Sequence, residues 1–341
     1  MRLEYSAKID QGRVRPYNED AAVMLPQYGF FAVSDGMGGL LYGKETAQFV
    51  VEWLRQVIAH DAAELEHVPA EQRMEAARKG LLIRIRQLNE YIYKRGNAHG
   101  RAVYGATLAA AWIIEGQVLF ANVGDSRGYQ TTEAGLVQRS EDHNVAAMLV
   151  EIGQLTVEEA KDHPTSCQLT QFIGCQPEEL FPSMHVFDAP IGSRVLLCSD
   201  GLYGMLEEVQ LQELMQGEPE QCCEALIAAA NEAGGRDNIS AVIAVCCEGE
   251  PEEAESVVLY AKDEEPAEEN EAEPAEEEVD AEELPEEEAE TSEAEKSDDA
   301  QPEEDIPASP ANGKTPAEEA PAEETPAEGT PESPADGEPQ E

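Results

Sequence analysis

The chain has 341 residues, of which 72 are acidic and 22 are basic, and its formal net charge is −50. This negative surplus argues against a nucleic-acid partner, because no basic stripe is present to neutralise phosphates. No stretch of about 18 uncharged apolar residues occurs and the chain does not begin like a secretion signal, so we expect no membrane span and a cytoplasmic protein.

The acidic residues divide the chain into two parts. Residues 251–341 hold 36 acidic residues and three lysines in irregular Pro-Ala-Glu repeats, with almost no large apolar side chain after Tyr260. A segment of this composition cannot bury a core. We therefore predict one folded domain over residues 1–248 and a disordered acidic tail over residues 249–341.

The first part alternates between the hydrophobic periods of strands and helices. In chain order, these patterns predict a strand at 29–34, helices at 45–59 and 74–93, strands at 107–114 and 118–123, a helix at 144–152, a strand at 194–199, a helix at 221–233 and a strand at 239–246. Turn signals at 115–116 and 133–135 join consecutive strands into hairpins, which form antiparallel sheets. We therefore expect an α+β fold in which two antiparallel sheets pack together with helices outside.

Acidic residues stand at the ends of the apolar runs. The motifs are "YNED", "AVSDG", "LFANVGDSR", "VLLCSDG" and "GGRDNIS", and they contain Asp20, Asp35, Asp125, Asp200 and Asp237. Taken singly, each aspartate is explained by a turn or a loop cap. Taken together, they predict carboxylates that gather at one rim of the sandwich, where oxygen ligands suit Mg²⁺ or Mn²⁺.

Arg15, in "RVRPYNED", stands shortly before the acidic pair Glu19 and Asp20. Two neighbouring metal ions activate a water and neutralise phosphate oxygens. A guanidinium donates two parallel N–H bonds to a phosphate and stays charged at cellular pH. Arg15 is therefore a candidate phosphate-binding residue, with an ordinary surface ion pair to Glu19 as the alternative.

The order of the motifs carries a family resemblance. "RVRPYNED", "VSDGMGG", "YGATLAA", "NVGDSRGY", "CSDGLYG" and "GGRDNIS", spread over nearly all of residues 1–250, resemble the metal-dependent serine/threonine protein phosphatases of type 2C in their bacterial form. The resemblance implies a four-layer α-β-β-α sandwich with two Mg²⁺ or Mn²⁺ ions in a cleft at one end of the sheets. It also implies that a metal-activated water hydrolyses phosphoserine and phosphothreonine in proteins.

The resemblance also implies roles for single residues. Asp35 is expected to bridge the two metals, and Arg15 to grip the substrate phosphate. The implied metal ligands are Glu19 or Asp20 through metal-bound water, Asp35, the Gly36 carbonyl, Asp200 and Asp237, with Asn238 orienting the cluster and Asp125 near a third, weaker metal.

The sequence departs from the family pattern in three places. Met37 stands where many eukaryotic relatives carry a histidine that is proposed to protonate the leaving group, and a thioether cannot donate a proton. His143, in "SEDHN", is our candidate for that catalytic role, with an exposed or capping histidine as the alternative. In that alternative, metal-bound water protonates the leaving group. Gln171 replaces an arginine common in relatives, and residues 40–42 replace small residues after the Gly-Gly.

Two rival functions remain open at this point. One is a catalytically silent metal-binding scaffold of the same fold, and the other is a phosphatase of small phosphorylated metabolites. The expected partners of the protein phosphatase are phosphorylated proteins, in particular a serine/threonine kinase and its substrates. We expect a monomer.

Overall fold

The strands pair antiparallel throughout the described residues and form two sheets. The computed structural model describes residues 1–97, 102–161, 163–251 and 254–261. The strands are β1 (Arg2–Asp10), β2 (Asp20–Leu25), β3 (Phe30–Asp35), β4 (Leu108–Ile114), β5 (Gln117–Val123), β6 (Arg127–Thr132), β7 (Gly135–Gln138), β8 (Ser183–Asp188), β9 (Arg194–Cys198), β10 (Ile239–Cys247) and β11 (Val257–Tyr260). One sheet has the order β1-β10-β9-β6-β7 and the other β11-β2-β3-β4-β5-β8.

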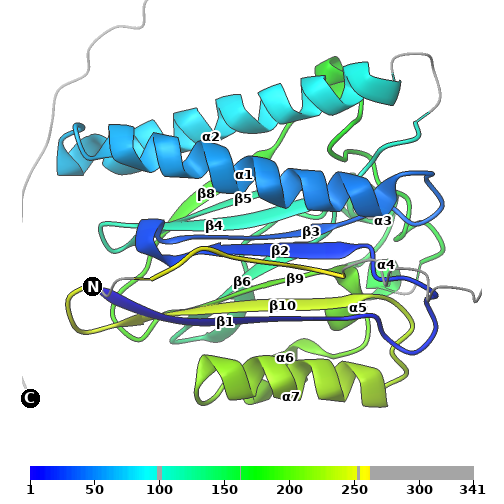
Figure 1. Cartoon of the computed structure of the whole chain (residues 1–341). Coiled ribbons are helices and arrows are strands. Elements are labelled where there is room, and N and C mark those ends of the chain that lie inside the picture. Colours follow the sequence, from blue (N-terminus) through cyan, green and yellow to red (C-terminus); the bar gives the residue numbers. More distant parts are fainter. Residues whose placement is uncertain (98–101, 162, 252–253, 262–341) are drawn as a thin grey trace, which may run out of the picture. The chain divides into compact units, whose positions relative to one another are not determined.

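Helices cover the outer faces of both sheets, which gives the four layers that were predicted. The helices are α1 (Gly43–Leu65), α2 (Ala70–Ile92), α3 (Val145–Glu151), α4 (Val157–Lys161), α5 (Asp200–Tyr203), α6 (Glu208–Leu214) and α7 (Pro219–Glu232). Figure 1 shows α1 and α2 over the sheet that contains β2 to β5, and α6 and α7 under the sheet that contains β1 and β10. The α+β sandwich of two antiparallel sheets is confirmed.

Each boundary between layers holds an apolar core. Leu54 of α1 and Leu81 of α2 are fully buried against the six-stranded sheet. Phe31 and Phe120 belong to the core between the two sheets. Leu226 of α7 is buried against the five-stranded sheet. Strand β2, "DAAVML", is buried along its whole length because both of its faces meet a core.

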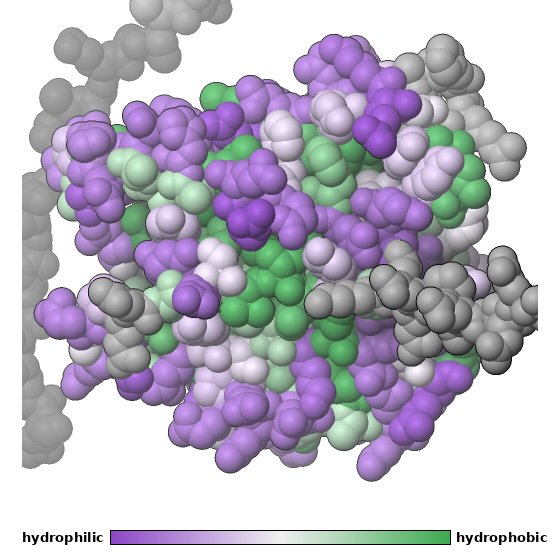
Figure 2. All heavy atoms as spheres, viewed as in Figure 1, coloured by the Kyte–Doolittle hydropathy of each residue, from purple (hydrophilic) through white to green (hydrophobic). Residues whose placement is uncertain are grey.

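Apolar side chains also reach the molecular surface at the edge between the sheets. Figure 2 shows a patch of them near the centre of this face, with largely polar surfaces above and below. Strands β1 and β11 edge the two sheets, and their partly buried Leu3, Tyr5 and Leu259 pack on the core between the sheets. Sheet edges with mixed exposure carry weaker sequence periodicity than central strands.

The predicted elements agree with the structure wherever the pattern is strong. The strands predicted at 29–34, 107–114, 118–123, 194–199 and 239–246 correspond to β3, β4, β5, β9 and β10, and the four predicted helices to α1, α2, α3 and α7. The hairpin turns at 115–116 and 133–135 join β4 to β5 and β6 to β7. The sequence patterns gave no residue range for the fully buried strand β2, for β6, or for the partly exposed strands β1, β7, β8 and β11.

The boundary predicted at residue 248 is too early. Strand β11 pairs with β2 from Val257 to Tyr260, and Tyr260 packs on the core beneath α1. The four residues Val257–Tyr260, "VVLY", are apolar or aromatic and add an edge strand to the sheet. The folded part of the chain therefore continues past residue 248. The tail predicted from 249 lies, from residue 262 onward, outside the described residues.

No helix in the part of the chain that the structure describes has the length and apolar character needed to cross a bilayer.

Candidate metal and phosphate site

Aspartates from distant segments meet at one end of the sheets. Asp20 opens β2 and Asp35 closes β3, and the two residues are directly paired across these strands. Asp200 follows β9 and opens α5. Asp237 stands just before β10, and Asp125 just after β5. This is the end of the sheets at which β2 begins and β3 ends in Figure 1.

Asp20 is enclosed between the two sheets. Its side chain is 1 % exposed, and its Oδ2 accepts hydrogen bonds from Ser199 Oγ at 2.8 Å and Ser240 Oγ at 2.6 Å. Its Oδ1 is buried and has no hydrogen-bond partner in the protein, and the same is true of Asp200 Oδ1. A buried carboxylate oxygen without a partner is costly unless a cation compensates it.

Burial and mutual repulsion perturb the acidities of these carboxylates. Burial, followed by the charge of Asp20, raises the pKa of Asp35 well above its usual range. Burial raises the pKa of Asp20 to about 7 and, with the charge of Asp237, that of Asp200 to about 6. Burial and the charge of Asp200 also raise the pKa of Asp125. The negative charges of these aspartates act on one another, so the aspartates form a single electrostatic cluster.

Arg15 is the cation of this cluster. Its Nη2 donates to Asp237 Oδ2 at 2.6 Å, while its side chain remains 41 % exposed. The charges of Asp200 and Asp35 also act on it. Arg15 therefore pairs with a cluster aspartate and not with Glu19, the partner in the alternative interpretation. The Nη1 atom comes so close to Gly38 that a Cβ there would lie 2.8 Å away.

Asn238 joins the loop before β2 to the segment before β10. Its Oδ1 accepts from the Glu19 backbone N–H at 2.8 Å, and its Nδ2 donates to the carbonyl oxygens of Gln11 and Tyr17. The Gly36 N–H donates to the Glu19 carbonyl at 3.2 Å. A Cβ at Gly36 would lie 2.5 Å from the Gly43 backbone, so glycine is required for this close approach.

His143 does not fit its predicted catalytic role. The ring is 8 % exposed, and its Nδ1 accepts from the Gly124 N–H at 3.2 Å. The proton therefore lies on Nε2, which faces Ser183 Oγ at 2.8 Å. Burial lowers the pKa of His143, which keeps the ring neutral. Both nitrogens are engaged, so neither is available to protonate a leaving group.

The residues at the other positions that depart from the family pattern make defined contacts. Met37 donates its backbone N–H to the Gly105 carbonyl at 3.0 Å. The Gln171 side chain accepts from the Phe181 N–H at 2.6 Å. Leu41 is 70 % exposed, and Tyr42 stacks on Tyr104 with 4.6 Å between ring centroids.

The cluster has the chemistry of a hard-cation site. Oxygen donors dominate, and two of them are buried without partners. Among the described residues, no three His, Cys, Asp or Glu side chains are already grouped around a single ion position. Carboxylates repel one another when no cation lies between them, and Mg²⁺ and Mn²⁺ keep several water ligands. The residues present therefore fit such ions with few protein ligands each.

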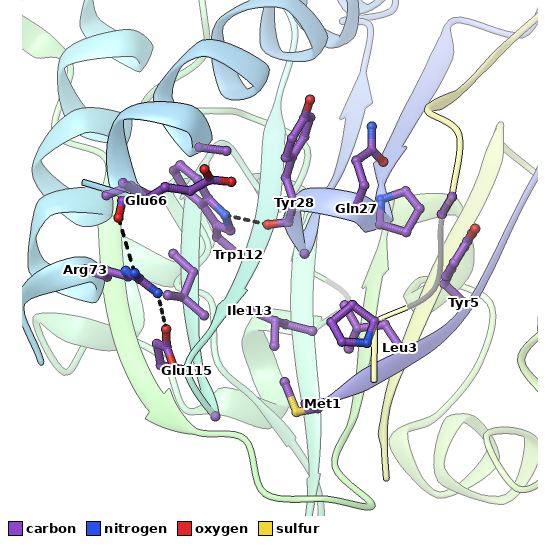
Figure 3. A pocket seen from close by; sticks show the side chains of 18 residues that line it. Met1, Leu3, Tyr5, Gln27, Tyr28, Glu66, Arg73, Trp112, Ile113 and Glu115 are labelled. Carbon is purple, nitrogen blue, oxygen red and sulfur yellow. Dashed lines mark hydrogen bonds and ion pairs between the residues drawn. The ribbon is translucent and has the colours of Figure 1, made fainter. Parts of the chain in front are cut away.

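A cavity of about 380 Å³ adjoins the cluster. Its lining includes Asp125, Asp200 and residues of α3 and α4. A larger cavity of about 530 Å³ lies at the opposite end of the sheets, where β2 ends at Leu25 (Figure 3). There Arg73 is bound to Glu115, and Trp112 Nε1 donates to the Tyr28 carbonyl. None of the predicted site residues lines the larger cavity.

The sequence interpretation missed the hydroxyl groups that support the carboxylates. Ser199 and Ser240 hold Asp20, and Thr107 and Ser126 contact each other at 2.6 Å next to Asp35 and Asp125. All four are at most 2 % exposed. They lie within the quoted motifs, and a hydroxyl residue inside an apolar run was the signal that could have found them, because a buried hydroxyl needs a partner.

Known proteins resemble this chain over most of its folded part. A family model for protein phosphatase 2C matches residues 15–241. The serine/threonine phosphatase stp of Listeria monocytogenes is 30% identical over 243 residues, which are 69% of this chain and 93% of that protein. The serine/threonine protein phosphatase PstP of Mycobacterium tuberculosis is 30% identical over 244 residues, which are 71% of this chain and 45% of that protein.

Solved structures show the same likeness. The catalytic domain of PstP in complex with two manganese ions has a TM-score of 0.58 and 28% identity, and the match covers 72% of this chain and 99% of that one. The structure of the Mycobacterium smegmatis phosphatase MsPP in complex with cacodylate has a TM-score of 0.59 and 29% identity, with 73% and 100% covered.

Proposed function

The chain belongs to the protein phosphatase 2C family, and from this premise we propose which of its residues carry out the reaction. It is a metal-dependent serine/threonine protein phosphatase that acts on phosphorylated proteins and uses two Mg²⁺ or Mn²⁺ ions. The observation that supports the residue assignment is the gathering of five aspartates from five segments, two of which have a buried oxygen without a partner.

The proposed metal ligands are the cluster carboxylates. Asp35 takes the central position because Asp20, Asp200, Asp125 and Asp237 all act on it electrostatically. Glu19 and the Gly36 carbonyl are also proposed ligands, because Gly36 follows Asp35 directly and its N–H donates to the Glu19 carbonyl. Asp125 is the proposed residue for a third, weaker ion. When bound, the ions supply an activated water and positive charge beside the phosphate.

Arg15 is the proposed substrate-binding residue. A guanidinium has five N–H donors, so the bond to Asp237 leaves donors for two phosphate oxygens. Asp237 in turn fixes the direction of the guanidinium. Because the side chain is 41 % exposed, a phosphate can reach it from solvent.

Asn238 and His143 are proposed to position other groups. Asn238 holds the loop that carries Glu19 and Arg15, since its amide bonds three backbone groups of that loop. His143 holds both backbone groups of Gly124, next to Asp125, through its own N–H and its Nδ1. In this assignment neither residue transfers a proton to the leaving group.

We also propose the cellular setting. The cysteines form no disulfide among the described residues and five of the seven are buried, which suits a reducing compartment such as the cytoplasm. The net charge of −50 opposes self-association and favours a monomer. A serine/threonine kinase and its substrates are the proposed natural sources of the phosphoproteins.

Replacement of Asp35 tests the site. Asp35→Asn keeps the size of the side chain but removes the charge, and we expect turnover of a phosphoserine peptide with Mn²⁺ to fall by at least about a thousandfold. Circular dichroism should show an unchanged fold. Asp188→Asn is the matched control, because Asp188 is exposed at the other end of the sheet.

The control variant should hydrolyse the peptide at the rate of the parent protein. Parent-like activity of Asp35→Asn would overturn the assignment. Absence of activity in the parent protein, on phosphopeptides and on an aryl phosphate alike, would favour the silent scaffold.

A further inference from the structure

Thr107, in the motif "YGATLAA", is fixed to the strand that carries Asp35. It stands just before β4 and is 2 % exposed. Its N–H donates to the Asp35 carbonyl at 2.8 Å, and its carbonyl accepts from Ser34 Oγ at 2.7 Å. The backbone of Thr107 therefore has a defined position relative to the end of β3.

The Thr107 side chain touches two loops at once. Its Oγ1 accepts from the Asp35 N–H at 3.0 Å and shares a hydrogen bond with Ser126 Oγ at 2.6 Å. Ser126 directly follows Asp125 and is 1 % exposed. The Thr107 methyl group packs so closely on Gly124 that a Cβ there would lie 2.7 Å from Cγ2.

Other residues fix the Asp125 loop from different sides. Tyr203 donates its hydroxyl to the Asp125 carbonyl at 3.0 Å. The His143 N–H donates to the Gly124 carbonyl at 3.0 Å. Neither residue contacts Asp35 through a hydrogen bond given by the structure, whereas the Thr107 hydroxyl bonds both segments.

We infer that the Thr107 hydroxyl is a positioning group that sets the Asp125 loop relative to Asp35 and so tunes divalent-cation binding between them. This inference rests on the proposed function, in which both aspartates face the metal centre. Without the hydroxyl, the Asp35 N–H and Ser126 Oγ lose a partner in a buried region, which favours a shift of one loop against the other. Groups that orient metal ligands from outside the coordination sphere commonly change metal affinity when they are lost.

Two substitutions separate the hydroxyl from the methyl group. Thr107→Val has the same shape and lacks the hydroxyl, while Thr107→Ser keeps the hydroxyl and lacks the methyl. The readout is the melting temperature of the full chain as a function of Mn²⁺ concentration, starting from EDTA. Only ions that bind the folded state raise the melting temperature, and the acidic residues after 250 are the same in all variants.

We expect Thr107→Val to need about 10- to 100-fold more Mn²⁺ for half of the rise in melting temperature. Thr107→Ser should stay close to the parent protein. The Mn²⁺ concentration for half-maximal turnover of a phosphopeptide should increase by the same factor as the Mn²⁺ concentration for half of the rise in melting temperature. The turnover rate at saturating Mn²⁺ should be largely retained.

An unchanged Mn²⁺ midpoint in Thr107→Val, with only a lower melting temperature in EDTA, would overturn the inference and leave a purely structural hydroxyl. Equal loss in Thr107→Ser would do the same, because packing would then be the cause. If Thr107→Val does not fold, Ser126→Ala removes the same link and must raise the midpoint. An inactive parent protein refutes the proposed function, yet its Mn²⁺ midpoints still decide this inference.

Discussion

The buried carboxylate of Asp20 disfavours folding when it is ionised, and it is suited to cation binding in that same ionised form. It is 1 % exposed, and only one of its two carboxylate oxygens is hydrogen-bonded within the protein. Burial raises the pKa of Asp20 to about 7. The folded, metal-free protein therefore prefers Asp20 protonated, whereas a cation prefers it ionised.

This preference predicts a pH effect on metal-free stability. Since the pKa of Asp20 is higher in the folded than in the unfolded state, the folded state binds the extra proton between about pH 4 and pH 7, and stability falls as pH rises through this window. Asp20→Asn removes the part of this effect that comes from Asp20. In EDTA, we expect Asp20→Asn to melt higher than the parent protein at about pH 8 and close to it at about pH 4.

The measurement is thermal unfolding of both proteins over that pH range. Mn²⁺ should stabilise the parent protein more at about pH 8 than at about pH 5, because protons compete for the ligand. A constant difference between the two proteins at every pH would contradict the assignment of the shift to Asp20.

At the scale of elements, strand β11 completes the six-stranded sheet and directs the chain toward the metal end. Tyr260 pairs with Ala21, the residue after Asp20. Gln48 of α1 donates to the Ala261 carbonyl at 3.4 Å. Val258 and Tyr260 face the core under the helices, while Val257 and Leu259 face the core between the sheets. The strand thus belongs to the folded unit.

Two shortened chains test this role of β11. A chain that ends at residue 261 should melt like the full protein, and one that ends at residue 248 should lose roughly 2–4 kcal/mol of unfolding free energy, because four partly buried apolar side chains and the pairing with β2 are missing. Urea unfolding measures the unfolding free energy of both shortened chains and of the full protein. Equal stability of the two chains would show that β11 contributes nothing to the fold.

At the scale of the whole molecule, charge governs which peptides approach. The net charge is −50, and the segment after residue 250 contributes −33 of it. Such a field repels acidic phosphopeptides and attracts basic ones, and salt screens both effects. The metal ions and Arg15 act at the short range of the site itself.

Salt should therefore change substrate preference. Raising ionic strength from low to physiological should increase kcat/KM for a phosphopeptide with acidic flanking residues and decrease it for one with basic flanking residues. Steady-state kinetics with the two peptides and a neutral one provide the measurement. Parallel responses of the acidic and basic peptides would show that long-range charge is not involved.

Much of this protein follows from its local sequence. Strong periodicity predicted α1, α2 and five of the central strands, because buried elements need apolar residues at regular spacing. Strands β1 and β11 were not predicted because partly exposed edges lack such a pattern. The order of the motifs indicated the family. These motifs contain aspartate, glycine and arginine, the residue types that metal-dependent phosphate hydrolysis needs.

The sequence by itself determined the element types, the acidic composition after residue 250 and the candidate ligands, because these depend on residues close together in the chain. Only the tertiary structure decided which groups touch. Ser240 bonds Asp20 across 220 positions and Thr107 bonds Asp35 across 72. The Nε2 atom of His143 faces Ser183 Oγ, 40 positions further along the chain. Such contacts depend on how two sheets stack and on strand register, and no local pattern encodes either.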